Sequence, residues 1–116
     1  MDDVVKVAIV VLSGTATHAD MGRVANALEA VKGFKQANGR IKLIFDGAGT
    51  KWLSELSEPD HPLHGLFESV RANITGACSC CAVAFGAEEG VQACGVPLLV
   101  DYDKRLASQG YKVIAY

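Results

Sequence analysis

The sequence lacks the features that would point to a membrane or a nucleic acid. Its apolar run at residues 7–12 is far shorter than the roughly 20 residues that a membrane-spanning helix needs. The eleven lysines and arginines are scattered and form no basic stripe that would follow a phosphate backbone. We therefore expect neither a membrane nor a nucleic acid as a direct partner.

The marks of a secreted protein are also missing. The chain opens with Met1-Asp2-Asp3, whereas a secretion signal has a basic start. Its four cysteines lack the even spacing of a disulfide framework. In a reducing compartment such cysteines favour catalytic, redox or metal chemistry. We expect a cytoplasmic protein.

Nothing in the sequence divides the chain into parts. It has 116 residues, of which 50% are hydrophobic and 21% charged, and it shows no repeat, linker or low-complexity segment. This length suits one domain with a proper core and is too short for two. We expect a single domain over residues 1–116.

Strand and helix patterns alternate along the chain. Residues 4–12 are almost continuously β-branched or aliphatic, which is typical of a strand buried on both faces. The alternation predicts an α/β fold with a mostly parallel sheet of about five strands, right-handed crossovers and helices on both faces. Further strands are expected at 41–45, 74–77 and 111–116, with 97–100 too short to assign, and helices at 17–37, 52–56, 60–70, 82–85, 88–94 and 103–108.

Three of the four cysteines fall within four positions, and Cys78 is the first of them. We expect Cys78 where a short strand ends and a helix begins. Backbone N–H groups at a helix N-terminus have no intrahelical acceptor, and their dipoles favour a thiolate over a thiol. Chemistry in open α/β sheets collects at the carboxyl ends of the strands. The pattern predicts a reactive thiol at Cys78.

The second cysteine of interest is Cys81, which forms a C-x-x-C pair with Cys78. Positions i and i+3 share one face of a helix, so the two sulfurs could close or exchange a disulfide. Cys80 is one residue off this register and points to another side. The alternative interpretation is that all three are small buried hydrophobic residues. Cys94, on the apolar side of a later helix, is expected to pack in the core.

A zinc site is a further possibility for the cysteine pair. Structural zinc usually takes four cysteine or histidine ligands, and the chain offers Cys78 and Cys81 with His61 and His64 but no second cysteine pair. The two histidines are also explained as polar residues around a helix start. We expect no metal ion.

Two loops are candidate ligand sites. Gly47-Ala48-Gly49 follows a strand, but Trp52 occupies the position of the third glycine of a dinucleotide fingerprint. We expect a turn there and no bound cofactor. The loop at residues 13–17 is a weaker candidate for an oxyanion or small ligand, and His18 could supply a proton or a positive charge beside it.

The arrangement of a late strand, then Cys78, then Gly86 eight residues on resembles the DsrE/DsrF-like family, which includes the TusD and YchN type proteins. Residues 7–12, 45–47 and 110–114 are similar to the first strand, the end of the second strand and the last strand of that family. The resemblance covers nearly the whole chain. It implies a flavodoxin-like three-layer sandwich, with members assembled into trimers or hexamers.

The resemblance also implies a function. In that family the cysteine matching Cys78 carries sulfur as a persulfide, and Cys81 matches a second cysteine that some members have. We therefore expect a sulfur carrier or sulfurtransferase-like protein, whose sulfur donor and acceptor are separate proteins. Two alternatives stay open: a thiol–disulfide oxidoreductase or redox sensor that uses Cys78 and Cys81, and a non-enzymatic oligomeric binding module.

One apolar surface bears on assembly. It consists of Trp52, Leu53, Leu56, Leu63, Leu66, Phe67 and Val70. These side chains either complete the second helical layer or are buried between subunits, since monomers rarely leave large apolar patches in water. The resemblance favours the second option. We expect a homotrimer or homohexamer with cyclic symmetry.

Overall fold

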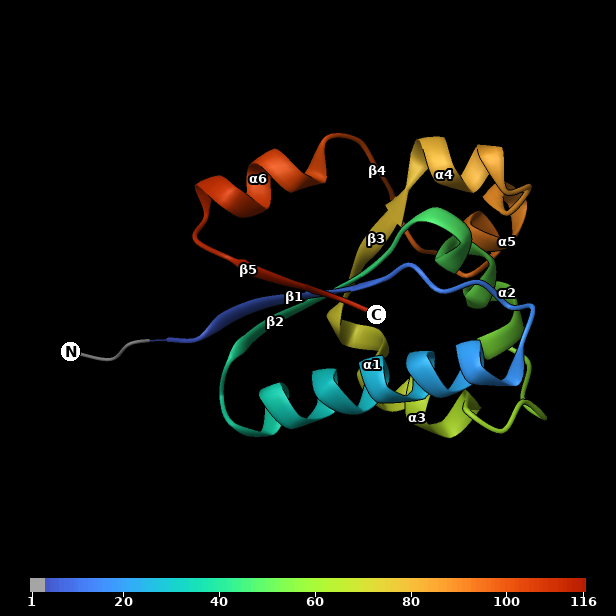
Figure 1. Cartoon of the computed structure of the whole chain (residues 1–116), viewed down its shortest axis with the longest axis horizontal. Coiled ribbons are helices and arrows are strands. Elements are labelled where there is room, and N and C mark those ends of the chain that lie inside the picture. Colours follow the sequence, from blue (N-terminus) through green and yellow to red (C-terminus); the bar gives the residue numbers. More distant parts are fainter. Residues whose placement is uncertain (1–3) are drawn as a thin grey trace.

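The computed structural model describes residues 4–116, which form one parallel sheet with helices on both faces (Figure 1). All strand pairs are parallel, and the strand order is β4-β3-β2-β1-β5. This confirms the predicted α/β class and the three-layer arrangement. The acidic start at residues 1–3 lies outside the described residues. The strands are β1 (Lys6–Val11), β2 (Arg40–Phe45), β3 (Ile74–Cys78), β4 (Leu98–Leu99) and β5 (Lys112–Ala115).

The helices follow the predicted segments with small shifts. The α-helices are α1 (His18–Gln36), α2 (Trp52–Leu56), α3 (His64–Val70), α4 (Ser79–Ala84), α5 (Glu88–Ala93) and α6 (Tyr102–Ser108), and the 3-10 helices are η1 (Gly47–Lys51) and η2 (Arg71–Asn73). Helix α1 starts at its predicted cap, where the Asp20 N–H donates to Thr17 Oγ1 at 3.0 Å. Within residues 4–116, no helix is both long enough and apolar enough to cross a membrane.

Helix α3 begins later than the sequence predicts. The expected start was near Asp60, but residues 57–63 form turns. His61 precedes Pro62, which disfavours helical backbone angles at His61. Its Nδ1 atom also accepts the Leu63 N–H at 3.0 Å, a local bond that competes with the helical pattern.

The two faces of the sheet are covered unequally. The larger apolar cluster packs Ile9, Leu43 and Phe45 against helices α1 to α5. On the opposite face, Ile44 and its neighbours on β1 pack against Leu106 of α6. Figure 1 shows α6 on one side of the sheet and α1 and α3 on the other.

The strand order explains this asymmetry. From β1 to β4 the chain moves in one direction across the sheet, and right-handed crossovers in one direction place their helices on the same face. The connection from β4 to β5 runs back past β1, so its helix, α6, lies on the other face. The start of α6 therefore lies next to the carboxyl ends of β2 and β3.

The apolar surface considered for subunit contacts is mostly internal. Trp52, Leu53, Leu56, Phe67 and Val70 are at most 2% exposed and belong to the larger cluster. The remaining two leucines of that surface are half-buried against the same cluster. These side chains complete the helical layer within one subunit, so they do not support the expected oligomer.

Candidate functional site

Cys78 lies where the sequence predicts it. It is the last residue of β3 and the N-cap residue of α4, with extended backbone angles (φ −61°, ψ 122°). Its side chain is half-buried at the carboxyl edge of the sheet. Gly76 makes this edge possible, because a Cβ atom there would lie 2.5 Å from Leu99 Cγ and 2.7 Å from the Pro97 carbonyl oxygen. The missing side chain lets β4 approach β3 and brings the following segment alongside Cys78.

Asp46 occupies the equivalent position after β2. Phe45 is in register with Ala77, so Asp46 and Cys78 are the next residues at the same edge of the sheet. One carboxylate oxygen of Asp46 accepts the Gly47 N–H at 2.7 Å. The other accepts the Tyr102 hydroxyl at 2.5 Å. Asp46 is thus fixed in orientation from two sides.

Asp46, Cys78 and Cys81 form a compact group, which we call the thiol–carboxylate cluster. One carboxylate oxygen and the two sulfur atoms all lie within 4.8 Å of one another. All three side chains are half-buried, and both cysteines are free. Cys80 is exposed and lies outside the cluster, in agreement with its different helical register. The structure therefore joins the predicted pair to a carboxylate that was not among the predicted site residues.

The carboxylate sets the protonation of its neighbours. Burial acts to raise the pKa of Asp46, but hydrogen bonds from Tyr102, Cys81 and Gly47 outweigh it and leave the pKa below its usual value. The hydrogen bond to Asp46, together with burial, raises the pKa of Cys81 from 9.0 to about 11. Burial and the same carboxylate raise the pKa of Tyr102. At neutral pH the site holds an ionised Asp46 beside a protonated Cys81 and a neutral Tyr102.

A cavity of about 420 Å³ opens beside the cluster. Cys78 and Asp46 line it, whereas Cys81 does not. Within residues 4–116, the lining contains three carboxylates and no basic side chain. It consists of Asp46, Cys78, Cys80, Leu99, Val100, Asp101, Tyr102 and Asp103.

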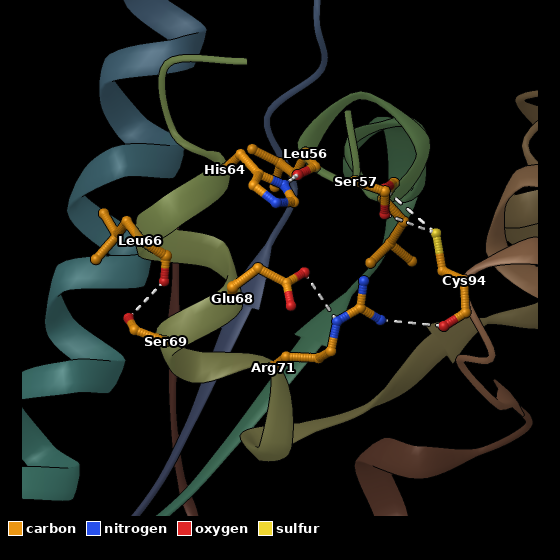
Figure 2. Close-up of polar contacts among 9 residues, drawn as sticks. Leu56, Ser57, His64, Leu66, Glu68, Ser69, Arg71 and Cys94 are labelled. Carbon is orange, nitrogen blue, oxygen red and sulfur yellow. Dashed lines mark hydrogen bonds and ion pairs between the residues drawn. The ribbon is translucent and has the colours of Figure 1, made fainter. Parts of the chain in front are cut away.

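Cys94 is not part of the thiol–carboxylate cluster, and Figure 2 shows its own polar neighbours, which include Ser57 and Arg71. Its sulfur lies 3.0 Å from Ser57 Oγ and 3.4 Å from the Leu53 carbonyl oxygen. Its own carbonyl accepts a hydrogen bond of 3.1 Å from Arg71, which also pairs with Glu68 at 3.0 Å. Cys94 packs against the larger apolar cluster, as predicted, with its thiol held by these polar neighbours.

The histidines considered as zinc ligands lie elsewhere. His61 packs edge-on against Trp52, with ring centroids 6.0 Å apart. Nδ1 of His64 lies 2.8 Å from the Leu56 carbonyl oxygen (Figure 2). In the described part of the chain, the metal-ligating group around Cys78 contains Asp46 and Cys81 and neither histidine.

The two loops considered as ligand sites have structural roles. The carbonyls of Ser13 and Gly14 accept hydrogen bonds from Trp52 Nε1 at 2.8 and 3.0 Å, which ties the loop at residues 13–17 to α2. His18 is exposed at the start of α1. A Cβ atom on Gly49 would lie 2.1 Å from the carbonyl oxygen of Val11, so this glycine permits close packing on β1.

Sequence reasoning missed Asp46 and Tyr102. A signal existed for Asp46, because it directly follows one parallel strand and Cys78 ends another, and the carboxyl ends of parallel strands meet at one edge. No comparable signal pointed to Tyr102. Its position depends on how the segment after β4 returns over the sheet.

Comparison with known proteins supports the fold. No family model matches the chain, and no curated protein matches it. A solved structure of a conserved protein of unknown function from Bacteroides thetaiotaomicron is similar to it, with a TM-score of 0.61 and 19% identity. The match covers 94% of each chain. At this identity the likeness extends to the architecture and carries no statement about function.

Proposed function

We propose that the protein is a sulfur carrier that holds sulfane sulfur as a persulfide on Cys78. The observation that carries the proposal is that Cys78 lines an open cavity while its sulfur lies within 4.8 Å of a second thiol, that of Cys81. The thiolate of Cys78 attacks the outer sulfur of a donor persulfide, R–S–SH. The donor leaves as R–S⁻, and Cys78–S–SH remains. Transfer to an acceptor thiolate is the same exchange in the other direction.

Cys81 has a different part in this scheme. Its thiol attacks the inner sulfur of the Cys78 persulfide, the Cys78–Cys81 disulfide forms, and the terminal sulfur leaves as sulfide with the proton of Cys81. The two cysteines are oxidised and the sulfane sulfur is reduced. Only a thiolate attacks efficiently, and Asp46 raises the pKa of Cys81 to about 11. Cys81 therefore reacts slowly near neutral pH, which protects the persulfide until an acceptor arrives.

The partners in this proposal are a sulfur donor protein, a sulfur acceptor protein and further copies of the chain. The cavity beside Cys78 opens next to Val100, whose side chain is 65% exposed and offers apolar contact to a docking partner. Val83 and Val113, which are 59% and 51% exposed, supply apolar surface for a homotrimer or homohexamer. The uneven cysteine spacing fits a carrier in the reducing cytoplasm.

A second candidate function is thiol–disulfide exchange without sulfane sulfur. The observation that favours it is the distance between the Cys78 and Cys81 sulfurs, which is within 4.8 Å. A disulfide needs about 2.05 Å between the sulfurs, and side-chain rotation at the N-cap and in the first turn of α4 can supply the difference.

Mass spectrometry after incubation with glutathione persulfide tests the proposal. The wild type, Cys81→Ser and Cys94→Ser should each gain the mass of one sulfur atom, and Cys78→Ser should not. Limiting iodoacetamide should also label Cys78 before Cys94. If no variant takes up sulfur but the Cys78–Cys81 disulfide cycles with glutathione at a defined potential, the second candidate replaces the first.

A further inference from the structure

We infer that the thiol–carboxylate cluster of Asp46, Cys78 and Cys81 is a binding site for a thiophilic divalent metal ion such as Zn²⁺. The three ligand atoms come from the end of β2, the end of β3 and the first turn of α4. Zinc binds thiolate sulfur at about 2.3 Å, which places two sulfurs of a tetrahedral site about 3.8 Å apart. The cluster lies within 4.8 Å, so contraction by about 1 Å at most completes the geometry.

Charge favours a cation in this space. As metal ligands, the three groups are a carboxylate and two thiolates, which carry three negative charges. A divalent ion takes the place of the thiol protons and leaves a net charge of −1 on the centre. The step is M²⁺ plus two thiols giving M(S)₂ plus released protons, with no change of oxidation state.

The surroundings of Asp46 resemble those of a ligating carboxylate. Gly47 N–H and the Tyr102 hydroxyl each donate to one carboxylate oxygen, at 2.7 and 2.5 Å. Each oxygen has two lone pairs, so both bonds can persist while one oxygen binds a metal ion. Hydrogen bonds of this kind orient ligating carboxylates in metalloproteins and add to metal affinity.

The fourth coordination position faces the cavity. Two of the three ligands, Asp46 and Cys78, line the 420 Å³ space, so an ion bound to them is accessible from it. Three protein ligands with one open position are typical of centres that bind a small ligand on the metal. A thiophilic ion here would accept water, sulfide or a small thiolate. The sequence offers no set of four cysteine or histidine ligands for zinc, but the structure adds the carboxylate of Asp46 to the two cysteines.

Titration of metal-free protein with Co²⁺ and Zn²⁺ tests the inference. Co²⁺ should bind at one ion per chain and give the absorption of a tetrahedral thiolate complex, and Zn²⁺ should displace it. Cys78→Ser and Cys81→Ser should lose most of the thiolate-to-metal absorption. Asp46→Ala should weaken binding at least tenfold, and Tyr102→Phe about tenfold. Cys80→Ser and Cys94→Ser serve as matched controls and should bind like the wild type.

A second readout uses the wild type alone and does not depend on the folding of any variant. Zn²⁺ should protect Cys78 and Cys81 from iodoacetamide while the exposed Cys80 stays reactive. Failure to bind one ion per chain, or equal protection of Cys80, would overturn the site. If Asp46→Ala binds the ion with wild-type affinity, the assignment of the Asp46 carboxylate as a ligand is wrong. Sulfur uptake is measured on the metal-free protein, so its success or failure is separate from this result.

Discussion

Tyr102 donates the hydroxyl hydrogen bond of 2.5 Å that fixes Asp46, although the two residues are 56 positions apart in the chain. Tyr102 is the first residue of α6, and Asp46 follows β2. Among residues 4–116, α6 is the one helix on its face of the sheet, and the bond joins it to the thiol–carboxylate cluster. The carboxylate that raises the pKa of Cys81 is therefore held by a contact between distant segments.

Replacing the carboxylate should release Cys81. In Asp46→Asn the pKa of Cys81 should fall from about 11 toward 9.0, because the amide carries no charge to oppose a thiolate. The pH dependence of Cys81 alkylation in metal-free protein measures this. Asp101→Asn is the control, since it removes a carboxylate from the cavity rim. An alkylation midpoint that stays near 11 in Asp46→Asn would contradict the assignment.

Stability should decline at alkaline pH. The pKa of Cys81 is raised from 9.0 to about 11 in the folded state, so its contribution is fully present below pH 9.0 and is lost as the pH rises to about 11. The raised pKa of Tyr102 acts in the same direction above its ordinary value of 10.0. Free energies of unfolding from urea titrations across this range should fall less steeply in Cys81→Ser. If the free energy of unfolding falls equally steeply with pH in Cys81→Ser and the wild type, Cys81 does not contribute to the alkaline loss of stability.

Removing the hydroxyl of Tyr102 should destabilise the fold. Tyr102→Phe leaves the half-buried carboxylate without one donor, and hydrogen bonds to charged groups contribute roughly 1.5–3 kcal/mol when buried. Partial exposure of Asp46 reduces this, so we expect about 1 kcal/mol. The urea midpoint should shift without a change in slope. Tyr111→Phe is the matched control, because in residues 4–116 its hydroxyl makes no hydrogen bond. Equal shifts would argue against the Asp46 contact.

Gly76 should not tolerate a side chain. Gly76→Ala places a Cβ atom 2.5 Å from Leu99 Cγ and 2.7 Å from the Pro97 carbonyl, and overpacking of this kind costs roughly 1–3 kcal/mol. Gly33→Ala is the control in the interior of α1, where nothing lies within 4 Å. It should raise the free energy of unfolding by roughly 0.4–1 kcal/mol. Equal changes in the free energy of unfolding of Gly76→Ala and Gly33→Ala would contradict the close approach of β3 and β4.

The chain should assemble. We expect a trimer or hexamer with cyclic symmetry, so light scattering coupled to size exclusion, at micromolar concentration and moderate salt, should report at least three subunits. The exposed apolar side chains that remain for this contact include Val83 and Val113. A monomer that persists on concentration would refute the proposed trimer or hexamer.

The parts of the fold that the sequence predicted depend on local signals. The aliphatic run of β1, the Thr17 cap of α1 and the glycines after α5 and α6 each act within a few residues. The position of Cys78 between strand and helix belongs to this group. These features were correct because neighbouring residues alone determine them.

The parts that were missed depend on contacts between distant segments. Asp46 joins Cys78 only through the register of β2 and β3, and Tyr102 joins them only through the return of the chain to α6. Strand β4 has two residues, which are too few for a periodic pattern. It can pair with β3 because Gly76 has no side chain to clash with Leu99. The unequal cover of the sheet follows from strand order, which periodicity does not encode.

Helix α6 has a single buried residue, Leu106, so few apolar contacts hold it to the sheet. Segments with few buried apolar contacts undergo local opening while the rest of the protein stays folded, and their amide hydrogens exchange early. Each opening of α6 carries Tyr102 away from Asp46 and uncovers the cavity. The exposure of the thiols then depends on the opening of one short helix. A partner that binds α6 would change how often the thiols are exposed.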